Sequence, residues 1–221
     1  QLVTELSTKD AETLLAATRA KLPPDVQHYL PCAIRACDNG VKRAHLISRH
    51  LDGALMLELF TRDGVGTMIA SAPLAHLRSA TIDDVGGILQ IIEPLEEQGV
   101  LVRRSREVLE REIGQFSIVE RDGLIIACAA LYPFADSQAG ELACLAVNPE
   151  YRHGQRGDEL LEVIEQRARA TGLESIFVLT TRTRHWFEKR GFQLADPDSL
   201  PEARKRKYNW DRRSQVLLKK L

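Results

Sequence analysis

Residues 140–157 hold the residue types best suited to chemistry in this chain, and they read GELACLAVNPEYRHGQRG. The apolar part predicts a strand over residues 142–147. Asn148 and Pro149 end that strand, because proline cannot donate a ladder hydrogen bond and asparagine favours turns. Residues 152–157 then lead into an amphipathic helix that Gly172 ends. The N–H groups and dipole at a helix start bind anions, so this stretch predicts a seat for a pyrophosphate.

The elements that must position this stretch fall into two predicted units, joined by a linker at residues 71–73. In the first unit, the apolar spacing predicts helices over residues 7–22, 23–40 and 51–60 and strands over residues 44–47 and 67–70. The second unit begins near Leu77. There, Thr81 with Asp84 and Ser105 each predict the start of a helix.

The rest of the second unit is rich in strands. Residues 116–132 predict a hairpin that turns at Asp122 and Gly123. Residues 174–180 and 215–220 predict two further strands, and residues 182–190 a short helix closed by Gly191. The order β-α-α-β-β-β-α-β-α-β favours an α/β fold, a mixed sheet with helices on its faces.

Composition limits the classes of function. The chain has 221 residues, of which 44% are hydrophobic and 28% charged, with a net charge of −1. This balance gives no overall attraction to nucleic acid or to an anionic membrane, and no apolar run is long enough for a membrane span. The sequence also shows no signal peptide. We therefore expect a cytoplasmic protein without nucleic-acid or membrane partners.

Cysteine and histidine give no sign of a metal site. The four cysteines lack CxxC spacing and lie in apolar contexts, so they are interpreted as buried, reduced thiols. The six histidines show no spacing typical of metal ligands. The chain also begins at Gln1 rather than Met, which favours a piece of a longer protein.

Two motifs resemble those of the GCN5-related N-acetyltransferases. Residues 140–172 resemble the acetyl-coenzyme A loop of that family, and WFEKRGF at residues 186–192 resembles its Y-E-K-x-G-F element. Gln155 stands where the family's R/Q-x-x-G-x-G motif has its middle glycine, and Phe187 stands where a tyrosine often protonates the departing thiolate. The resemblance implies that acetyl-coenzyme A is bound by Leu145, Val147, Arg152, Gln155, Arg156 and Gly157.

A closer resemblance covers nearly the whole chain. RAHLISRHLDGALMLELFTRDGVGTMI, EPLEEQGVLVRRSRE, GELACLAV and FVLTTRTRHWFEKRGF are similar to segments of the bacterial N-acetylglutamate synthase family. The resemblance implies that residues 1–74 are the end of an amino-acid-kinase-like domain and residues 75–221 an N-acetyltransferase domain. That family acetylates the α-amine of L-glutamate, the first step of arginine synthesis, and L-arginine inhibits the full-length protein. No metal is implied.

The same resemblance implies catalytic roles. Glu141 is the candidate base, although an unperturbed glutamate has a pKa of about 4.3, which burial or a water chain must offset. The backbone N–H near Cys144 and Leu145 is the candidate oxyanion donor. Thr180, with Thr181 as a neighbour, is the candidate partner of the leaving thiolate. A covalent route through the Cys144 thiol and purely structural roles for Glu141 and Thr180 stay open.

Arginines are the candidate substrate ligands, because a planar guanidinium suits carboxylates. Arg104, and Arg212 with Ser214, match the glutamate contacts of the family, while surface roles stay open for both arginines. The basic run Arg204-Lys205-Arg206-Lys207 is interpreted as a solvated loop.

In the first unit, LELFTRDGVGT (residues 57–67) resembles the arginine site of arginine-sensitive kinases and synthases. Glu58 would bind the guanidinium, and Gly64 and Gly66 would let the backbone approach it. An ordinary helix and turn remains the alternative for residues 57–67. Two alternatives remain for the function of the chain: an acetyltransferase for another amine or a peptide N-terminus, and a regulatory or assembly module. Apolar surface left on the incomplete unit favours a homo-oligomer.

Overall fold

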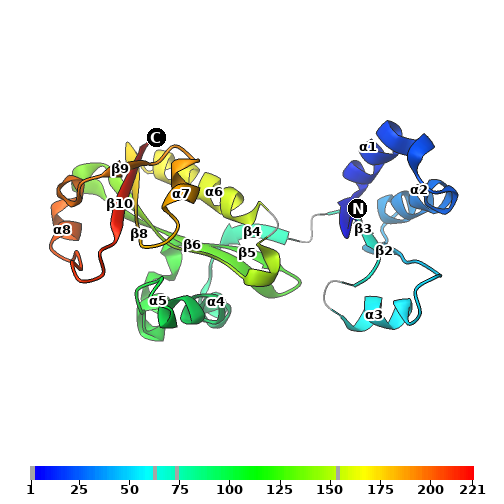
Figure 1. Cartoon of the computed structure of the whole chain (residues 1–221), viewed down its shortest axis with the longest axis horizontal. Helices are drawn as coiled ribbons and strands as arrows, with labels where there is room; N and C mark the ends of the chain where they lie inside the picture. The colour runs from blue at the N-terminus through cyan, green and yellow to red at the C-terminus, as the bar shows by residue number, and fades with distance from the viewer. Residues whose placement is uncertain (1–2, 62–63, 73–74, 153–154) are drawn as a thin grey trace. The chain divides into compact units, whose positions relative to one another are not determined.

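The packing separates the chain into two units, Gln1–Leu74 and Ala75–Leu221 (Figure 1). The computed structural model describes residues 3–61, 64–72, 75–152 and 155–221. Each unit has its own sheet and its own buried core.

Unit 1 is a small three-stranded sheet with helices. Its elements are β1 (Glu5–Ser7), α1 (Thr8–Thr18), α2 (Pro24–Asp38), β2 (Arg43–Leu46), α3 (Ala54–Phe60) and β3 (Thr67–Ala70), with a 3-10 turn at Arg19–Lys21. The strands lie in the order β1-β3-β2. Ser7 caps α1 by accepting from the Asp10 backbone N–H at 3.0 Å. Strand β1 was not predicted, because its three residues are too few to show a pattern and pair with a strand distant in sequence.

Unit 2 contains a seven-stranded sheet in the order β4-β5-β6-β7-β8-β10-β9. Its strands are β4 (Ala75–Ser79), β5 (Phe116–Arg121), β6 (Leu124–Phe134), β7 (Ala139–Val147), β8 (Ser175–Thr180), β9 (Gln193–Ala195) and β10 (Gln215–Lys220). Its helices are α4 (Val85–Glu97), α5 (Arg106–Glu112), α6 (Arg156–Ala170), α7 (Arg184–Glu188) and α8 (Glu202–Lys205). Short 3-10 turns lie at Ile82–Asp84, Ile113–Gln115, Ala135–Ser137, Pro149–Tyr151 and Pro197–Ser199.

This arrangement confirms the predicted mixed-sheet α/β fold. The predicted order of elements is correct except that β9 and α8 were not foreseen. The predicted strand over residues 142–147 is part of a longer strand, since β7 already begins at Ala139.

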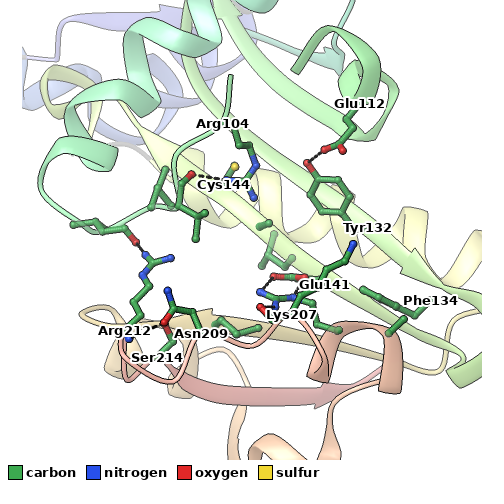
Figure 2. Close-up of a pocket in the computed structure, with 18 residues that line it drawn as sticks. Arg104, Glu112, Tyr132, Phe134, Glu141, Cys144, Lys207, Asn209, Arg212 and Ser214 are labelled. Carbon is green, nitrogen blue, oxygen red and sulfur yellow. Dashed lines mark hydrogen bonds and ion pairs between the residues drawn. The ribbon is translucent and has the colours of Figure 1, made fainter. Parts of the chain in front are cut away.

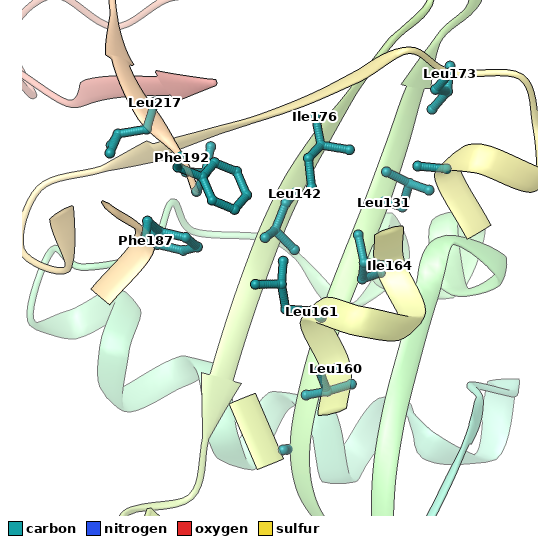
Figure 3. Close-up of a cluster of buried hydrophobic side chains, with 14 of the residues drawn as sticks. Leu131, Leu142, Leu160, Leu161, Ile164, Leu173, Ile176, Phe187, Phe192 and Leu217 are labelled. Atoms are coloured by element: carbon teal, nitrogen blue, oxygen red, sulfur yellow. The ribbon is translucent and has the colours of Figure 1, made fainter. Parts of the chain in front are cut away.

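Helices cover both faces of the sheet. Leu160, Leu161 and Ile164 of α6 pack on one face with Leu142 and other residues, as Figure 3 shows. On the other face, α4 contributes Val85, Ile88 and Ile92, and α5 contributes Leu109. Because strands between two helical layers are buried on both faces, β6 reads as an almost continuous apolar run.

The centre of the sheet carries two irregularities that position the site. Strands β6 and β7 shift register between Cys128 and Ala130, so two residues of β7, Cys144 and Leu145, lie opposite Ala129 alone. Cys144 accordingly has a positive φ of 51°. The parallel pairing of β7 with β8 spans only residues 139–141 of β7, so the two strands separate beyond Glu141. A bulge and a gap between central strands therefore adjoin each other.

Candidate functional site

A cavity of about 570 Å³ opens along β7 between Glu141 and Cys144 (Figure 2). One wall comes from the loop between α4 and α5, including Val100 and Arg104. Another comes from α8 and the loop before β10. Of the predicted site residues, the cavity brings together Glu141, Cys144, Arg104, Arg212 and Ser214.

Glu141 is held by an arginine that sequence reasoning placed in solvent. Arg204 donates to both of its carboxylate oxygens, from Nε to Oε2 at 2.6 Å and from Nη2 to Oε1 at 3.0 Å. Both side chains are mostly buried, with exposed fractions of 18% for Arg204 and 13% for Glu141. Each carboxylate oxygen has more than one acceptor position, so this bidentate pair leaves Glu141 able to accept another proton donor. The prediction that Arg204 lies in a solvated loop is wrong.

Cys144 lies at the bulge and is buried. Burial raises the pKa of its thiol to about 11, although the positive charge of Arg104 opposes this shift. The thiol therefore stays protonated near neutral pH, which disfavours a nucleophilic role. The bulge instead makes backbone groups available, because the regular pairing of β7 with β6 is interrupted at Cys144 and Leu145.

Arg104 lines the cavity near Cys144. Its backbone N–H donates to Glu96 Oε1 at 3.1 Å, and its Nη1 to the Val102 carbonyl at 3.0 Å. Burial alone would lower the pKa of Arg104, but Cys144, Tyr132 and neighbouring groups hold it above its usual value. The guanidinium thus stays charged inside the cavity.

Arg212 reaches into the cavity from the loop before β10. Its Nη2 donates to the carbonyls of Val100 and, at 3.3 Å, Gly99. Burial lowers the pKa of Arg212, and the charges of Arg104 and Arg204 lower it further. Three guanidinium groups therefore create a positive potential in the cavity, as an anionic ligand requires. Ser214 is buried beside them, and its carbonyl accepts from the Tyr208 hydroxyl at 2.5 Å.

Four polar residues of the cavity were not predicted from the sequence as site residues: Glu112, Tyr132, Lys207 and Asn209. The Tyr132 hydroxyl donates to Glu112 Oε2 at 2.9 Å. Burial raises the pKa of Tyr132 above its usual range, so the hydroxyl keeps its proton. Tyr132 lies in an apolar strand and Glu112 in an ordinary polar helix, and neither has a local pattern that predicts a site.

Thr180 and Phe187 lie outside the residues that line the cavity. The Thr180 hydroxyl accepts from the Thr183 N–H at 3.1 Å and lies 2.8 Å from the Thr183 hydroxyl, so it supports the turn before α7. Phe187 is buried in the core beside Phe192, with ring centroids 5.3 Å apart. A phenylalanine therefore fills space where the resembling family has a tyrosine hydroxyl.

The start of α6 is held by contacts with α7. Asp158 binds Arg190, whose guanidinium lies 3.7 Å from the ring centroid of Trp186. A Cβ on Gly157 would lie 3.1 Å from the Trp186 ring, so glycine lets the ring pack more closely there than a larger residue would. Arg156 pairs with Glu159 at 3.0 Å. These contacts hold the first turn of α6 in place.

Other predicted coenzyme contacts lie on the same side. Leu145 is part of the bulge and Val147 follows it, and both pack against the core beneath α6. Arg152 is exposed, and Gln155 directly precedes α6. Residues 153–154 of the predicted loop lie outside the described residues.

In unit 1, Glu58 binds its own loop. Its Oε2 accepts from the N–H groups of Val65 and Gly66 at 2.7 and 2.8 Å, and its Oε1 accepts from His45 Nδ1 at 2.5 Å. Burial opposes ionisation, but these hydrogen bonds outweigh it and lower the pKa of Glu58. A Cβ on Gly64 would lie 2.4 Å from Glu58 Oε2, so glycine is needed for the approach to Glu58 itself.

All four cysteines are free thiols, and three of them are buried. Cys37, Cys128 and Cys144 are buried free thiols as predicted, whereas Cys32 is exposed. Among the described residues, no group of three or more His, Cys, Asp or Glu side chains could hold a metal ion. In the same residues, every helix is too short or too polar to cross a membrane.

Comparison with known proteins agrees with this architecture. Residues 87–192 match the Acetyltransferase (GNAT) family. The amino-acid acetyltransferase of Azotobacter vinelandii is 65% identical over 208 residues, which are 94% of this chain and 48% of that protein. The chain thus spans about half the length of the curated relatives it matches.

Two solved structures are similar over the full chain. N-acetylglutamate synthase from Neisseria gonorrhoeae complexed with coenzyme A and L-arginine has a TM-score of 0.84 and 39% identity, covering 100% of this chain and 50% of that one. The same enzyme complexed with coenzyme A and N-acetyl-glutamate has a TM-score of 0.65 and 41% identity, covering 100% and 51%.

Proposed function

Since unit 2 has the fold of the GNAT acetyltransferases and the chain is a relative of the amino-acid acetyltransferases, we propose that it transfers acetyl from acetyl-coenzyme A to the α-amine of L-glutamate. The charge of the cavity carries this proposal. Its lining holds four cations, Arg104, Arg204, Lys207 and Arg212, against two carboxylates, Glu112 and Glu141. The excess of positive charge suits a substrate that carries two carboxylates and a reacting amine.

Acetyl-coenzyme A is proposed to bind where β7 and β8 separate. Leu145 and Val147 would line its thioester arm. Arg152, Gln155, Arg156 and Gly157 would hold its pyrophosphate at the start of α6, where free N–H groups favour an anion. The fixed first turn of α6 supports this assignment.

The chemistry is proposed as direct transfer. Glu141 accepts the ammonium proton, directly or through a water, and the amine attacks the thioester carbonyl. The backbone N–H at Cys144 and Leu145 stabilises the oxyanion. The nitrogen then releases its second proton, the C–S bond breaks, and coenzyme A leaves as a thiolate that takes up a proton. Thr180 is the proposed donor to that thiolate, which requires its hydroxyl to turn away from Thr183.

Substrate orientation is assigned to the arginines. Arg104 and Arg212, with Ser214, are proposed to hold the α-carboxylate close to the bulge. Arg212 must then exchange its hydrogen bonds to Gly99 and Val100 for the substrate. All three residues line the cavity together with Cys144, with Ser214 buried and the two arginines half-buried, which supports the assignment.

We also propose that unit 1 belongs to an amino-acid-kinase-like domain and contributes to an L-arginine site in the full-length protein. Glu58, Gly64 and Gly66 would contact arginine, since a buried ionised carboxylate suits a guanidinium. Binding would compete with the hydrogen bonds that Glu58 makes to its own loop. The protein would act in the cytoplasm as a homo-oligomer, in arginine biosynthesis.

A thiol-release assay with acetyl-coenzyme A tests the function, with L-glutamate as acceptor and L-aspartate and L-lysine as controls. We expect turnover selective for glutamate. Equal or better turnover with lysine would contradict the proposal and favour an acetyltransferase for cationic amines.

A further inference from the structure

In the basic run at residues 204–207, Arg204 and Lys207 line the cavity, whereas Lys205 and Arg206 do not. One turn of helix, α8, includes Arg204 and Lys205 at its end. Residues three apart lie on the same side of a helical turn, and both Arg204 and Lys207 line the cavity. Lys205 instead pairs with Asp198, outside the cavity. The sequence-based prediction of a solvated loop is therefore wrong for Arg204, whereas Lys207 is exposed, as predicted, and also lines the cavity.

Arg204 and Lys207 differ in how their charges are used. Both carboxylate oxygens of Glu141 are bound by Arg204, so its charge is already paired. Among the residues that the structure describes, the Lys207 ammonium forms no ion pair, whereas its backbone carbonyl accepts from Arg204 Nη1 at 3.3 Å. That hydrogen bond fixes the backbone of Lys207 next to the cavity. Figure 2 shows its side chain extending into the cavity near Glu141 and Tyr132.

The Lys207 ammonium also lies apart from the guanidinium groups of Arg104 and Arg212. Arg104 and Arg212 are held by carbonyls of the α4–α5 loop at residues 99–102. Lys207 comes from the same segment before β10 as Arg212, but its side chain lies beside Glu141. Cys144 lies three residue steps along the strand from Glu141, which is about 10 Å at a rise of roughly 3.3 Å per residue. The cavity thus offers two cationic ends, with the proposed base beside one of them.

We infer that Lys207 is a specificity residue that binds the side-chain carboxylate of the substrate. This inference rests on the proposed function and adds to it the residue that distinguishes glutamate from neutral amino acids. An ammonium on a flexible stem gains a charge-assisted hydrogen bond from a carboxylate but not from an amide of the same shape.

The test compares K207M with K205M, which removes a neighbouring positive charge outside the cavity. Acceptors are L-glutamate, L-glutamine, which lacks the side-chain charge, and L-isoglutamine, which lacks the α-carboxylate charge. For K207M we expect a KM for glutamate raised about tenfold, an unchanged KM for glutamine and near-wild-type kcat. The preference for glutamate over glutamine should fall, while the preference over isoglutamine is kept. K207R should restore most of the affinity.

Other outcomes overturn the inference. If the KM for glutamate changes equally in K207M and K205M, Lys207 acts only through the overall positive charge and does not bind the substrate directly. Loss of the preference over isoglutamine instead would place the α-carboxylate at Lys207. Equal thermal unfolding and equal coenzyme A affinity of the variants exclude misfolding. If the wild type acetylates none of the three acceptors, the proposed function fails. Calorimetric binding of glutamate with coenzyme A present then decides on Lys207, because unchanged affinity in K207M would refute its role.

Discussion

At the scale of single residues, the cavity pairs groups that are far apart in sequence. Arg204 binds both carboxylate oxygens of Glu141, and Tyr132 donates to Glu112. In each pair the two side chains are hydrogen-bonded to each other, which limits the orientation of both. The two carboxylates of the cavity therefore have different partners and, by our proposal, different roles.

Replacing Glu141 with glutamine tests its role as base. We expect E141Q to lower kcat by about 10²- to 10⁴-fold, since an amide cannot take a proton from the ammonium. Coenzyme A affinity should stay unchanged, as measured by calorimetry. E112Q is the matched control, because it alters the other carboxylate of the cavity, and its kcat should fall much less. Equal losses in both variants would contradict the assignment.

Replacing Cys144 with alanine tests the thiol. Because burial holds the pKa of Cys144 near 11, the thiol is protonated at neutral pH and the oxyanion contact comes from backbone. We expect C144A to keep kcat within about threefold of the wild type. A loss beyond about 10³-fold with normal folding would instead support an acyl-cysteine route.

At the scale of elements, an ion-pair network ties β4 and β5 to the start of α4. Arg78 donates to Asp84 at 2.7 and 2.8 Å and to Glu120 at 2.6 Å, and Asp84 also accepts from the Thr81 N–H at 2.7 Å. Arg78 lowers the pKa of Asp84 to about 2 against the effect of burial. These contacts hold the helix whose C-terminal loop forms one wall of the cavity.

The network predicts a pH-dependent contribution to stability. The folded-state pKa of Asp84 lies below the unfolded value of about 3.9. Ionised Asp84 therefore stabilises the fold above that value, and the contribution is lost as the pH falls toward 2. We expect D84N to cost about 1–2 kcal/mol in urea unfolding near neutral pH.

That difference should shrink as the pH falls below about 4. A difference that stays constant with pH would show that the charge is not its source. E110Q, which removes an exposed partner of Arg106, is the control and should change stability by less than about 0.5 kcal/mol.

At the scale of the whole molecule, the two units differ in how much core each has. Unit 2 buries two extensive clusters, one on each face of its sheet. The core of unit 1 is small, with Leu30, Ile34 and Ile69 among its buried residues. Its helix α3 leaves Leu59 and Phe60 exposed by 67% and 76%. Large apolar side chains so exposed are typical of a surface that another segment covers.

This difference predicts that unit 2 is stable alone. Residues 75–221 expressed without unit 1 should unfold within about 4 °C of the full chain and bind coenzyme A with equal affinity. Residues 1–74 alone should be marginal, since so short a chain buries too little surface. Circular dichroism melting and calorimetry measure both. An unfolded 75–221 fragment would contradict the independence of its core.

The sequence by itself determined most elements, because caps, turns and apolar periodicity act over a few residues. Ser105 caps α5, the Asp122-Gly123 turn joins β5 to β6, and β10 spans the predicted residues 215–220. Resemblance to a family supplied Glu141, Arg104 and Arg212. Only the tertiary structure decided that Arg204 pairs with Glu141, that Lys207 lies beside them, and that Tyr132 meets Glu112. The residues of the two hydrogen-bonded pairs lie 20 and 63 positions apart in the chain. A local sequence pattern cannot predict contacts between residues that far apart.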